Sequence, residues 1–426
     1  MSDTTQTPWR RTTFKSICTS LVNGGTPDTG NSNYWNGATP WVTGADFNSR
    51  GIGEIRRFVS DAGIRSSSTS VVRAGNLLIV TRTGVGKLAV APCDIAISQD
   101  ITGVYLDTSQ GDTAFVYFLM QREVEELKKL NQGTSINGII RSDLEGYVVH
   151  IPCALAEQRR IAEMLGTIDI AIEKTESLIA KYQQIKAGLM RDLFTRGVTA
   201  DGKLRPPREQ APKLYQETAI GWLPKDWRVS VVRSCGEVKL GRQRSPDQHS
   251  GKWTMPYLRV ANVFDGFIEY SDILEMDFTP NERRVFSLVD GDILLNEGQS
   301  LELVGRSSIY RGDPHKYCFQ NTLVRFRCNS DNEPEFFCHL FKRWLERGQF
   351  QRIAKQTTSV AHLGADRFAR ISCPSVELVE QLRIADRLNS VDTQIRATKN
   401  ELDKLKKQKL GLMQDLLTGK VRVTAA

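Results

Sequence analysis

Hydrophobic residues recur at alternating spacings of four and three along the stretch that begins at Ile161. Ten positions follow this rule, of which Thr175 and Lys186 are polar and eight are apolar: Ile161, Leu165, Ile168, Ile172, Ile179, Tyr182, Leu189 and Leu193. Such a period, held for more than four heptads, is the seam of a coiled-coil helix. The pattern predicts a helix of roughly 37 residues, about 55 Å long at 1.5 Å per residue.

The same pattern returns in the second half of the chain, in a stretch that begins at Ile384. Its polar positions, Thr398 and Lys409, fall at the same two steps, and its apolar positions are Ile384, Leu388, Val391, Ile395, Leu402, Leu405, Leu412 and Leu416. Residues 157–198 and 380–421 align without a gap, with 18 of 42 positions identical. An internal repeat is considered before other features, because overlooking it leads to a wrong assignment of the whole fold. Polar residues in a seam cost stability but fix its register and partner.

A lone helix with one apolar stripe has nothing to cover that stripe. We therefore predict that the two repeated helices pack on each other, antiparallel and related by a pseudo-two-fold axis. Two alternatives stay open from the sequence. Each helix can pack on its own neighbouring domain, or the helices can form a coiled coil between two chains.

The helices divide the chain into two blocks with a similar order of turns and strand-like runs. The expected segments are a first block (1–154), a first helix (155–198), a linker with Gly and Pro-Pro (199–214), a second block (215–376), a second helix (377–421) and a tail (422–426). Each block has short strand-like runs and one late helix, at about Thr113–Leu130 and Glu333–Ala354. The predicted class is α+β: two globular, mixed α/β domains separated by two long antiparallel coiled-coil helices. We expect one domain at each end of the helix pair.

The composition is that of a soluble globular protein with a basic charge balance. Hydrophobic residues make up 40% of the chain and charged residues 25%, and the formal net charge is +8. This balance is compatible with nucleic-acid binding without establishing it. The eight cysteines are scattered without zinc-ligand spacing, the N-terminus is polar, and no apolar run approaches the ~20 residues of a membrane span. We expect a cytoplasmic protein that binds no metal and no membrane.

A search for catalytic motifs gives no constellation that an enzyme needs. The run "TRTGVGKLAV" at 81–90 lacks the glycine spacing and the Ser or Thr of a phosphate loop, and no strand leads into Gly-x-Gly-x-x-Gly. The aromatic-flanked Asp/Asn-Pro-Pro tetrapeptide of amino-methyltransferases is also missing from the sequence. We therefore predict no catalytic residue and a role in binding.

The layout resembles a known family. The two phrases "LAEQRRIAEML…GLMRDLFT" and "LVEQLRIADRL…GLMQDLLT" look like those of the specificity (S) subunit of type I restriction–modification systems. The stretch 24–47 is similar to the start of that family's target-recognition domains, and 220–229 is similar to the entry into the second one. The likeness covers essentially the whole chain. The second block departs at 239–253, where the first has its Gly-Gly-Thr-Pro run.

The resemblance implies a division of labour. The blocks would be target-recognition domains 1 and 2, each binding one half of a bipartite site in double-stranded DNA, with the helices setting the gap. Two modification (M) subunits would bring S-adenosylmethionine for adenine N6 methylation, and the target adenine would be flipped out of the duplex. Restriction (R) subunits would bring ATP and Mg for translocation and cleavage. This chain itself would bind no cofactor.

Candidate DNA contacts lie in the loops of the two blocks. Phosphate contacts require Lys, Arg, Ser, Thr or main-chain N–H groups, and base contacts require Arg, Lys, Asn or Gln. In the first block the candidates are Thr26, Arg82, Thr83, Lys87, Thr134, Ser135 and Asn137. In the second block they are Arg242, Gln243, Arg244, Arg259, Gln299, Ser300, Thr357 and Thr358. Each is also a residue type found in ordinary solvated loops.

Two other function classes compete with DNA recognition. One is a non-enzymatic coiled-coil scaffold whose two related heads bind protein. Another is a fused restriction–methyltransferase, which would need several hundred further residues with cofactor motifs. DNA affinity that falls steeply with salt separates the DNA-binding subunit from the scaffold.

Overall fold

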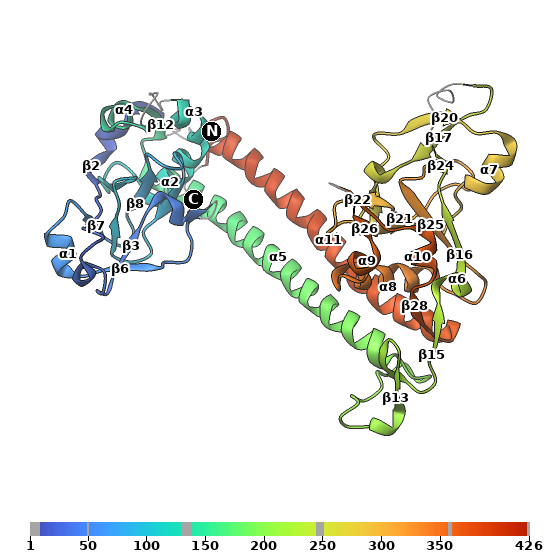
Figure 1. The fold of residues 1–426 in the computed structure, drawn as a ribbon. Helices are drawn as coiled ribbons and strands as arrows, with labels where there is room; N and C mark the ends of the chain where they lie inside the picture. The colour runs from blue at the N-terminus through green and yellow to red at the C-terminus, as the bar shows by residue number, and fades with distance from the viewer. Residues whose placement is uncertain (1–8, 49–50, 130–137, 244–250, 357–359, 424–426) are drawn as a thin grey trace. The chain divides into compact units, whose positions relative to one another are not determined.

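The computed structural model describes residues 9–48, 51–129, 138–243, 251–356 and 360–423. The chain forms two compact units, which we call unit 1 (Met1–Ser177 with Asn400–Ala426) and unit 2 (Leu178–Lys399). Each unit holds one of the two predicted blocks and a part of both long helices (Figure 1). Across the described ranges, none of the helices combines the length and apolar character needed to cross a membrane.

The two repeated segments are continuous helices. Helix α5 covers Leu155–Arg196 with 42 residues, and helix α11 covers Leu378–Leu416 with 39. Both are slightly longer than the length expected from the seam. The polar seam residues Thr175 and Thr398 fit the helix because each hydroxyl donates to the carbonyl four residues earlier, at 2.7 Å in both cases.

The helices pack antiparallel, as predicted. In unit 1, Lys409 Nζ lies 2.7 Å from Asp169 Oδ1 and Lys406 Nζ lies 3.1 Å from Glu176 Oε1. Residue numbers therefore decrease along α11 as they increase along α5. In unit 2, Lys186 Nζ lies 2.5 Å from Asp392 Oδ1. Lys186 and Lys409 are the polar seam residues of the two copies, and their Asp partners also stand at matching positions of the aligned repeat. The same ion pair is therefore made once in each unit.

Every seam position is buried or half-buried. The buried ones are Ile161, Leu165, Ile179, Leu193, Ile384, Leu388, Ile395 and Leu416, and the half-buried apolar ones are Ile168, Ile172, Tyr182, Leu189, Val391, Leu402, Leu405 and Leu412. Burial is deepest near the helix ends because residues there also join the domain cores. Leu165 shares a cluster with Phe115 and Met413, and Leu388 shares one with Phe336 and Phe194. The helices thus pack on each other and on the domains.

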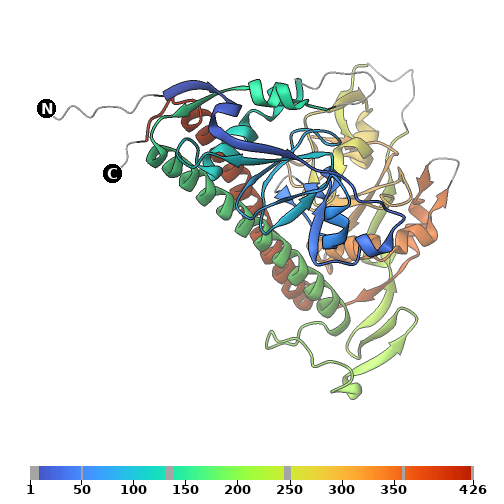
Figure 2. The same cartoon turned by 90° about the vertical axis from the view of Figure 1, so that its left-hand side faces the viewer.

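The domain of unit 1 is built on two four-stranded sheets, in the orders β2-β11-β8-β9 and β6-β3-β10-β7. Their strands are β2 (Cys18–Asn23), β11 (Ile101–Leu106), β8 (Leu77–Val80), β9 (Leu88–Val90), β6 (Arg57–Val59), β3 (Thr39–Val42), β10 (Ile95–Ile97) and β7 (Ser70–Val72). Two-stranded pairs join β1 (Trp9–Thr13) to β12 (Val148–Pro152) and β4 (Phe47–Asn48) to β5 (Gly51–Ile52). The view of Figure 2 turns this unit toward the reader.

Unit 2 repeats this frame with its own strands. Its sheets have the orders β16-β25-β21-β23 and β20-β17-β24, with pairs β15-β28 and β18-β19. The strands are β16 (Gly236–Leu240), β25 (Leu323–Cys328), β21 (Ile293–Asn296), β23 (Ser307–Ile309), β20 (Leu274–Asp277), β17 (Thr254–Leu258), β24 (Cys318–Phe319), β15 (Arg228–Val231), β28 (Ser372–Ser375), β18 (Val263–Phe264) and β19 (Phe267–Ile268). In both units the second sheet contains a parallel pair, β3 with β10 and β17 with β24.

Unit 2 also has elements without a described counterpart. The hairpin of β13 (Tyr215–Thr218) and β14 (Gly221–Pro224) follows the linker, and a small sheet joins β22 (Gly298–Gln299), β27 (Ala361–His362) and β26 (Lys355–Gln356). The short helices of the two units are α1 (Asp61–Arg65), α4 (Arg141–Gly146), α6 (Val232–Cys235), α7 (Pro280–Phe286) and α10 (Ala365–Ala369).

The late helix of each block is divided in two, where the sequence predicted one. Unit 1 has α2 (Thr113–Arg122) and α3 (Val124–Lys129), and unit 2 has α8 (Pro334–Glu346) and α9 (Gln349–Ile353). Gly348 ends α8 because its φ of 69° lies in the left-handed region that closes a helix. The continuous apolar pattern hid this break, since both parts bury residues in the same core.

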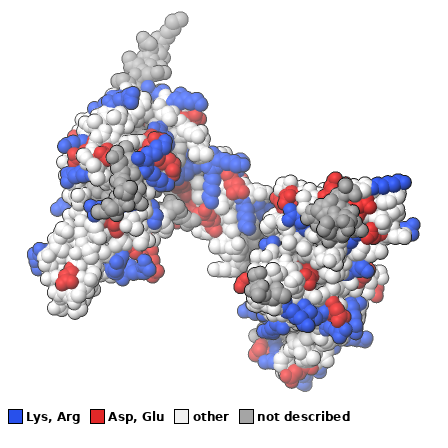
Figure 3. All heavy atoms as spheres, turned by 45° about the horizontal axis from the view of Figure 1, so that its top comes forward, with Lys and Arg blue, Asp and Glu red and all other residues white. Residues whose placement is uncertain are grey.

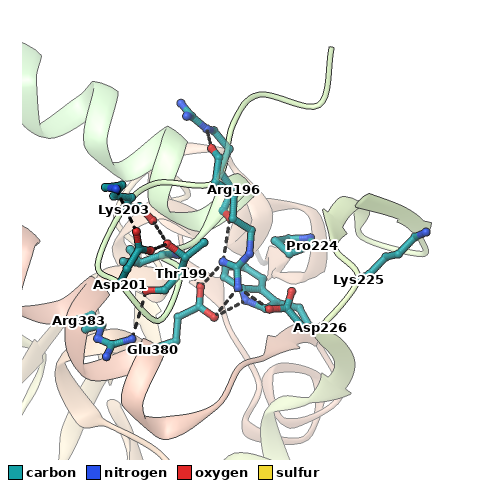
Figure 4. Close-up of polar contacts among 12 residues, drawn as sticks. Arg196, Thr199, Asp201, Lys203, Pro224, Lys225, Asp226, Glu380 and Arg383 are labelled. Carbon is teal, nitrogen blue, oxygen red and sulfur yellow. Dashed lines mark hydrogen bonds and ion pairs between the residues drawn. The ribbon is translucent and has the colours of Figure 1, made fainter. Parts of the chain in front are cut away.

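A buried carboxylate near the beginning of each long helix binds side chains from outside that helix, and Figure 4 shows the example of Glu380 in unit 2. In unit 2, Glu380 accepts hydrogen bonds from Arg205 Nη1 at 2.5 Å, Trp227 Nε1 at 3.1 Å and the Val198 N–H at 2.6 Å. Arg205 also pairs with Asp226. In unit 1 the equivalent Glu157 accepts from Trp9 Nε1 at 3.1 Å and from Arg422 Nε at 3.0 Å.

We expect Glu380→Ala to lower the free energy of unfolding of unit 2 by about 3–5 kcal/mol, because it leaves the buried Arg205 guanidinium without its main partner. Chemical denaturation measures this loss. Asp386→Ala, which removes an exposed charge from the same helix, is the matched control and should change stability by less than about 0.5 kcal/mol. Equal stability of the two variants would contradict the role assigned to this network.

Candidate nucleic-acid interface

The turn that follows β8 in unit 1 has the same backbone geometry as the turn that follows β21 in unit 2. In unit 1 the Val80 N–H donates to Lys87 O at 2.9 Å and the Gly86 N–H donates to Val80 O at 3.0 Å. In unit 2 the Asn296 N–H donates to Arg306 O and the Gly305 N–H to Asn296 O, both at 2.9 Å. Gly86 and Gly305 have φ of 91° and 82°, which glycine adopts readily. Lys87 and Arg306 are therefore equivalent residues.

The turn of unit 1 borders an open cavity of about 1340 Å³. Three sequence candidates line it, Arg82, Thr83 and Lys87. The other lining residues come from the turn itself, from β4 and β9, from the loop before β11 and from α2 and α3: Phe47, Asn48, Gly84, Val85, Gly86, Leu88, Gln99, Asp100, Gln121, Arg122, Val124, Glu125 and Lys128. The cavity is thus rich in groups that contact phosphates and base edges.

The candidates around this cavity differ in how firmly they are held. Lys87 Nζ donates to Gly44 O at 3.2 Å and to Phe47 O at 2.9 Å, so part of its bonding capacity supports the 44–47 loop. Thr83 Oγ1 donates to Asp100 Oδ1 at 3.3 Å. Arg82 is exposed, and its side chain has no hydrogen bond or ion pair within the described residues. Arg82 is therefore the candidate best placed for an external partner.

Thr26 belongs to the same neighbourhood through its own hydrogen bond. Its hydroxyl donates to Gln99 Oε1 at 2.6 Å, and Gln99 lines the cavity. The structure therefore brings Thr26 together with the three candidates of the 82–87 turn, which stand far from it in the sequence.

In unit 2 the candidates Gln299 and Ser300 follow the equivalent strand. Gln299 ends β22, where it pairs with Ala361 of β27. The side chains of Gln299 and Ser300 are half-buried. The Arg242 N–H donates to Phe319 O at 3.1 Å, as the Gly25 N–H donates to Ile97 O at 3.0 Å in unit 1, and the exposed Gln243 follows Arg242. Thr26 and Gln243 therefore occupy equivalent places, each one residue further along.

Two arginine candidates of unit 2 serve internal contacts. Arg242 is only 7% exposed; its Nε lies 2.6 Å from Glu282 Oε1, and its guanidinium stacks on Phe278 at 5.0 Å. Arg259 is paired with Asp272, and its main chain caps the turn that ends at Asn262. The sequence did not show this because neither acidic partner is a near neighbour of its arginine along the chain. We regard both as supports of the loop region.

Six candidates lie outside the described residues: Thr134, Ser135, Asn137, Arg244, Thr357 and Thr358. The residues that follow the stretches 130–137 and 357–359 are hydrogen-bonded to the turns after β8 and β21. The Ile139 N–H donates to Thr81 O at 2.7 Å, and the Leu363 N–H donates to Glu297 O at 2.8 Å.

The sequence analysis missed Arg306, Asn48, Gln99 and Lys128. A signal for Arg306 was present, because "VGKLAV" at 85–90 and "VGRSSI" at 304–309 share a glycine followed by a basic residue. Burial lowers the pKa of the Arg306 guanidinium, while the carboxylate of Asp265 acts to raise it. Gln99 and Lys128 had no such signal, since only the fold brings them to the cavity.

Charge alone does not mark this surface. On the face that Figure 3 shows, Lys and Arg side chains alternate with Asp and Glu and form no continuous basic area. Within the described ranges, no three His, Cys, Asp or Glu side chains are placed to hold a metal ion. The arrangement supports hydrogen-bonding contacts from loops on a rigid frame.

Comparisons with known proteins agree with the duplicated frame. The sequence model of the type I restriction modification DNA specificity domain matches residues 7–182 and again 224–407. The chain is 24% identical over 318 residues to the type I restriction enzyme MjaVIII specificity subunit of Methanocaldococcus jannaschii, covering 73% of this chain and 71% of that protein. It is 26% identical over 245 residues to the EcoKI specificity subunit of Escherichia coli, covering 55% and 48%.

The fold has a solved counterpart. The crystal structure of the S subunit of a type I restriction–modification system from M. genitalium matches with a TM-score of 0.61 at 17% identity, covering 98% of both chains. The resemblance expected from the repeated phrases is confirmed by the family match, which covers both halves of the chain. This chain belongs to the type I restriction–modification DNA specificity family, and it is a specificity subunit with two copies of the recognition domain.

Proposed function

We propose that each unit binds one half of a split site in double-stranded DNA, and that the two halves differ in sequence. The observation that carries this proposal is the equivalent turn with unlike residues. The turn from Asn296 to Arg306 is longer than the turn from Val80 to Lys87. Unit 1 offers Arg82 and Thr83 there, while unit 2 offers Gln299 and Ser300. A similar frame with different loops is suited to two different sequences.

The partners follow from the family. Type I specificity subunits work with DNA and with other restriction–modification subunits. We propose that this chain assembles with two M subunits, which bring S-adenosylmethionine and methylate adenine N6. R subunits would add ATP- and Mg-dependent cleavage. The chain itself would bind no cofactor and would act in the cytoplasm.

Exposed apolar side chains on the helices support an assembly with protein subunits. In unit 2, Leu178 and Ile185 of α5 are 40% and 41% exposed and lie two helical turns apart on one face. In unit 1, Ile170 of α5 and Leu410 of α11 are 54% and 60% exposed. Because these side chains point away from the seam, they are available to the M subunits.

A salt titration tests the central proposal. The chain, co-purified with its M partner, should bind DNA that carries its site with an affinity that falls steeply as salt rises, because phosphate contacts release counterions. With about six to ten phosphate contacts, the affinity should drop about 10³- to 10⁵-fold between roughly 50 and 200 mM salt. DNA with a scrambled site serves as the control. Affinity that is independent of salt and of sequence would favour the scaffold with protein-binding heads.

A further inference from the structure

Unit 2 presents two aromatic rings on a short, well-anchored hairpin. Strands β18 and β19 pair Val263 with Ile268 and Phe264 with Phe267, and Gly266 with a φ of 77° closes the two-residue turn. Val263 is fully buried in the core. The turn is held at two points, since Lys342 Nζ lies 2.8 Å from Asp265 Oδ2 and the Gly266 N–H donates to Ser307 O at 3.5 Å. The hairpin is therefore fixed on the domain.

The rings of this hairpin are stacked and partly open to solvent. The ring centroids of Phe264 and Phe267 are 5.0 Å apart with an interplanar angle of 5°, and Phe267 is 54% exposed. The Arg306 guanidinium lies 4.8 Å from the Phe264 centroid. Phe264 is half-buried, and a fixed, exposed ring stacked on it above a cation is typical of a contact surface, since Phe in a folded domain is otherwise mostly buried.

The hairpin borders the candidate interface of unit 2. Arg306 is the equivalent of Lys87 and ends the turn that carries Gln299 and Ser300. Its Nε is buried and has no hydrogen-bond partner among the described atoms. Phe264 therefore lies directly over the residue that corresponds to a cavity-lining lysine in unit 1.

The equivalent hairpin of unit 1 has no such rings. Strands β4 and β5 pair Phe47 with Ile52 and Asn48 with Gly51. Phe264 thus corresponds to Asn48, which lines the cavity of unit 1, and Phe267 corresponds to Gly51. One domain places a polar group and a glycine where the other places two aromatic rings.

We propose that Phe267, stacked on Phe264 above Arg306, makes an apolar contact with a base of the half-site that unit 2 binds. This inference rests on the proposed function and adds the residue and the chemistry. A ring without hydrogen-bonding groups distinguishes bases by shape, and in the major groove it favours the C5-methyl group of thymine. The two rings, Arg306 and the turn that carries Gln299 and Ser300 then form one DNA-contacting surface. At the matching place, unit 1 has Asn48 and Gly51 and makes no such aromatic contact.

The test compares Phe267→Ala with Trp222→Ala in the chain co-purified with its M partner. Trp222 is 42% exposed on β14 of the same unit and lies outside the candidate interface, so its variant is the matched control. We expect Phe267→Ala to bind the site about tenfold more weakly, to tolerate other bases at one position of one half-site, and to keep the salt slope, because no phosphate contact is lost. Trp222→Ala should match the wild type in all three measurements.

Replacing thymine by deoxyuridine, position by position in that half-site, isolates the methyl contact. One substitution should weaken the wild type and leave Phe267→Ala unchanged. The inference is overturned if Phe267→Ala keeps the affinity and the methylation pattern of the wild type, if no deoxyuridine substitution discriminates the two proteins, or if the variant loses its M partner while its DNA specificity is intact. If the wild-type protein showed no site-specific binding, the proposed function itself would be contradicted. That result differs from each outcome that overturns the inference on Phe267.

Discussion

We expect Leu388→Asp to lower the free energy of unfolding of unit 2 by several kcal/mol and to abolish site-specific DNA binding. Leu388 is fully buried in the cluster that joins α11, α5 and the domain core. A carboxylate placed there has neither water nor an ion-pair partner, and burying a charge in this way is among the most costly single changes. Denaturation with urea and a DNA-binding assay measure the two effects.

Leu382→Asp is the matched control, since it puts the same charge on the same helix at a position that is 40% exposed. It should keep the stability of unit 2 within about 0.5 kcal/mol of the wild type. Leu165→Asp is the corresponding change in unit 1, where Leu165 is also fully buried. From the seam alone one would expect the domains to stay folded in these variants. Because Leu165 and Leu388 belong to the domain cores as well, the domains should be destabilised too, and unchanged stability would contradict the packing described here.

The long helices were predictable because their signal is local and repeated. The seam spacing and the repeat predicted both helices, their antiparallel pairing and the polar positions Lys186 and Lys409. Their partners, Asp392 and Asp169, were not predicted, since an aspartate outside the seam has no local mark of its role. The same holds for Arg205 and Arg422, which reach Glu380 and Glu157 from segments beyond the helix ends.

The candidate interface was predictable only as far as its loops have sequence signatures. The Gly-Gly-Thr-Pro run and the glycine-containing turn pointed to Thr26, Arg82, Thr83 and Lys87, which the fold gathers around one cavity. Residue type alone also suggested Arg242, whose side chain is buried against Glu282 and Phe278. Residues such as Gln99 and Lys128 join the cavity through tertiary packing, and no pattern along the chain indicates that.

Exchange of the first domain should change one half of the recognised DNA site and leave the other half as it was. The exchanged segment is 1–154, replaced by the matching block of a relative with a different site. Its core includes Ile161 and Leu165 of α5 and Met413 and Leu416 of α11, so the donor must match these positions or bring its own. Trp9 must also be kept as a tryptophan, because its Nε1 donates to Glu157 and its ring lies beside Arg422.

The map of methylated adenines in DNA from cells with the chimera and its M partner measures the result. The reciprocal exchange of 215–376 is the matched control and should change the other half alone. The expected independence has a physical basis, since each unit has its own core and its own copy of the Lys–Asp and Glu–Arg ion pairs. Residues that share no partners contribute additively, so we expect a new domain in unit 1 to leave the loops of unit 2 unchanged. A chimera in which both halves of the site change would show that the two units do not read DNA separately.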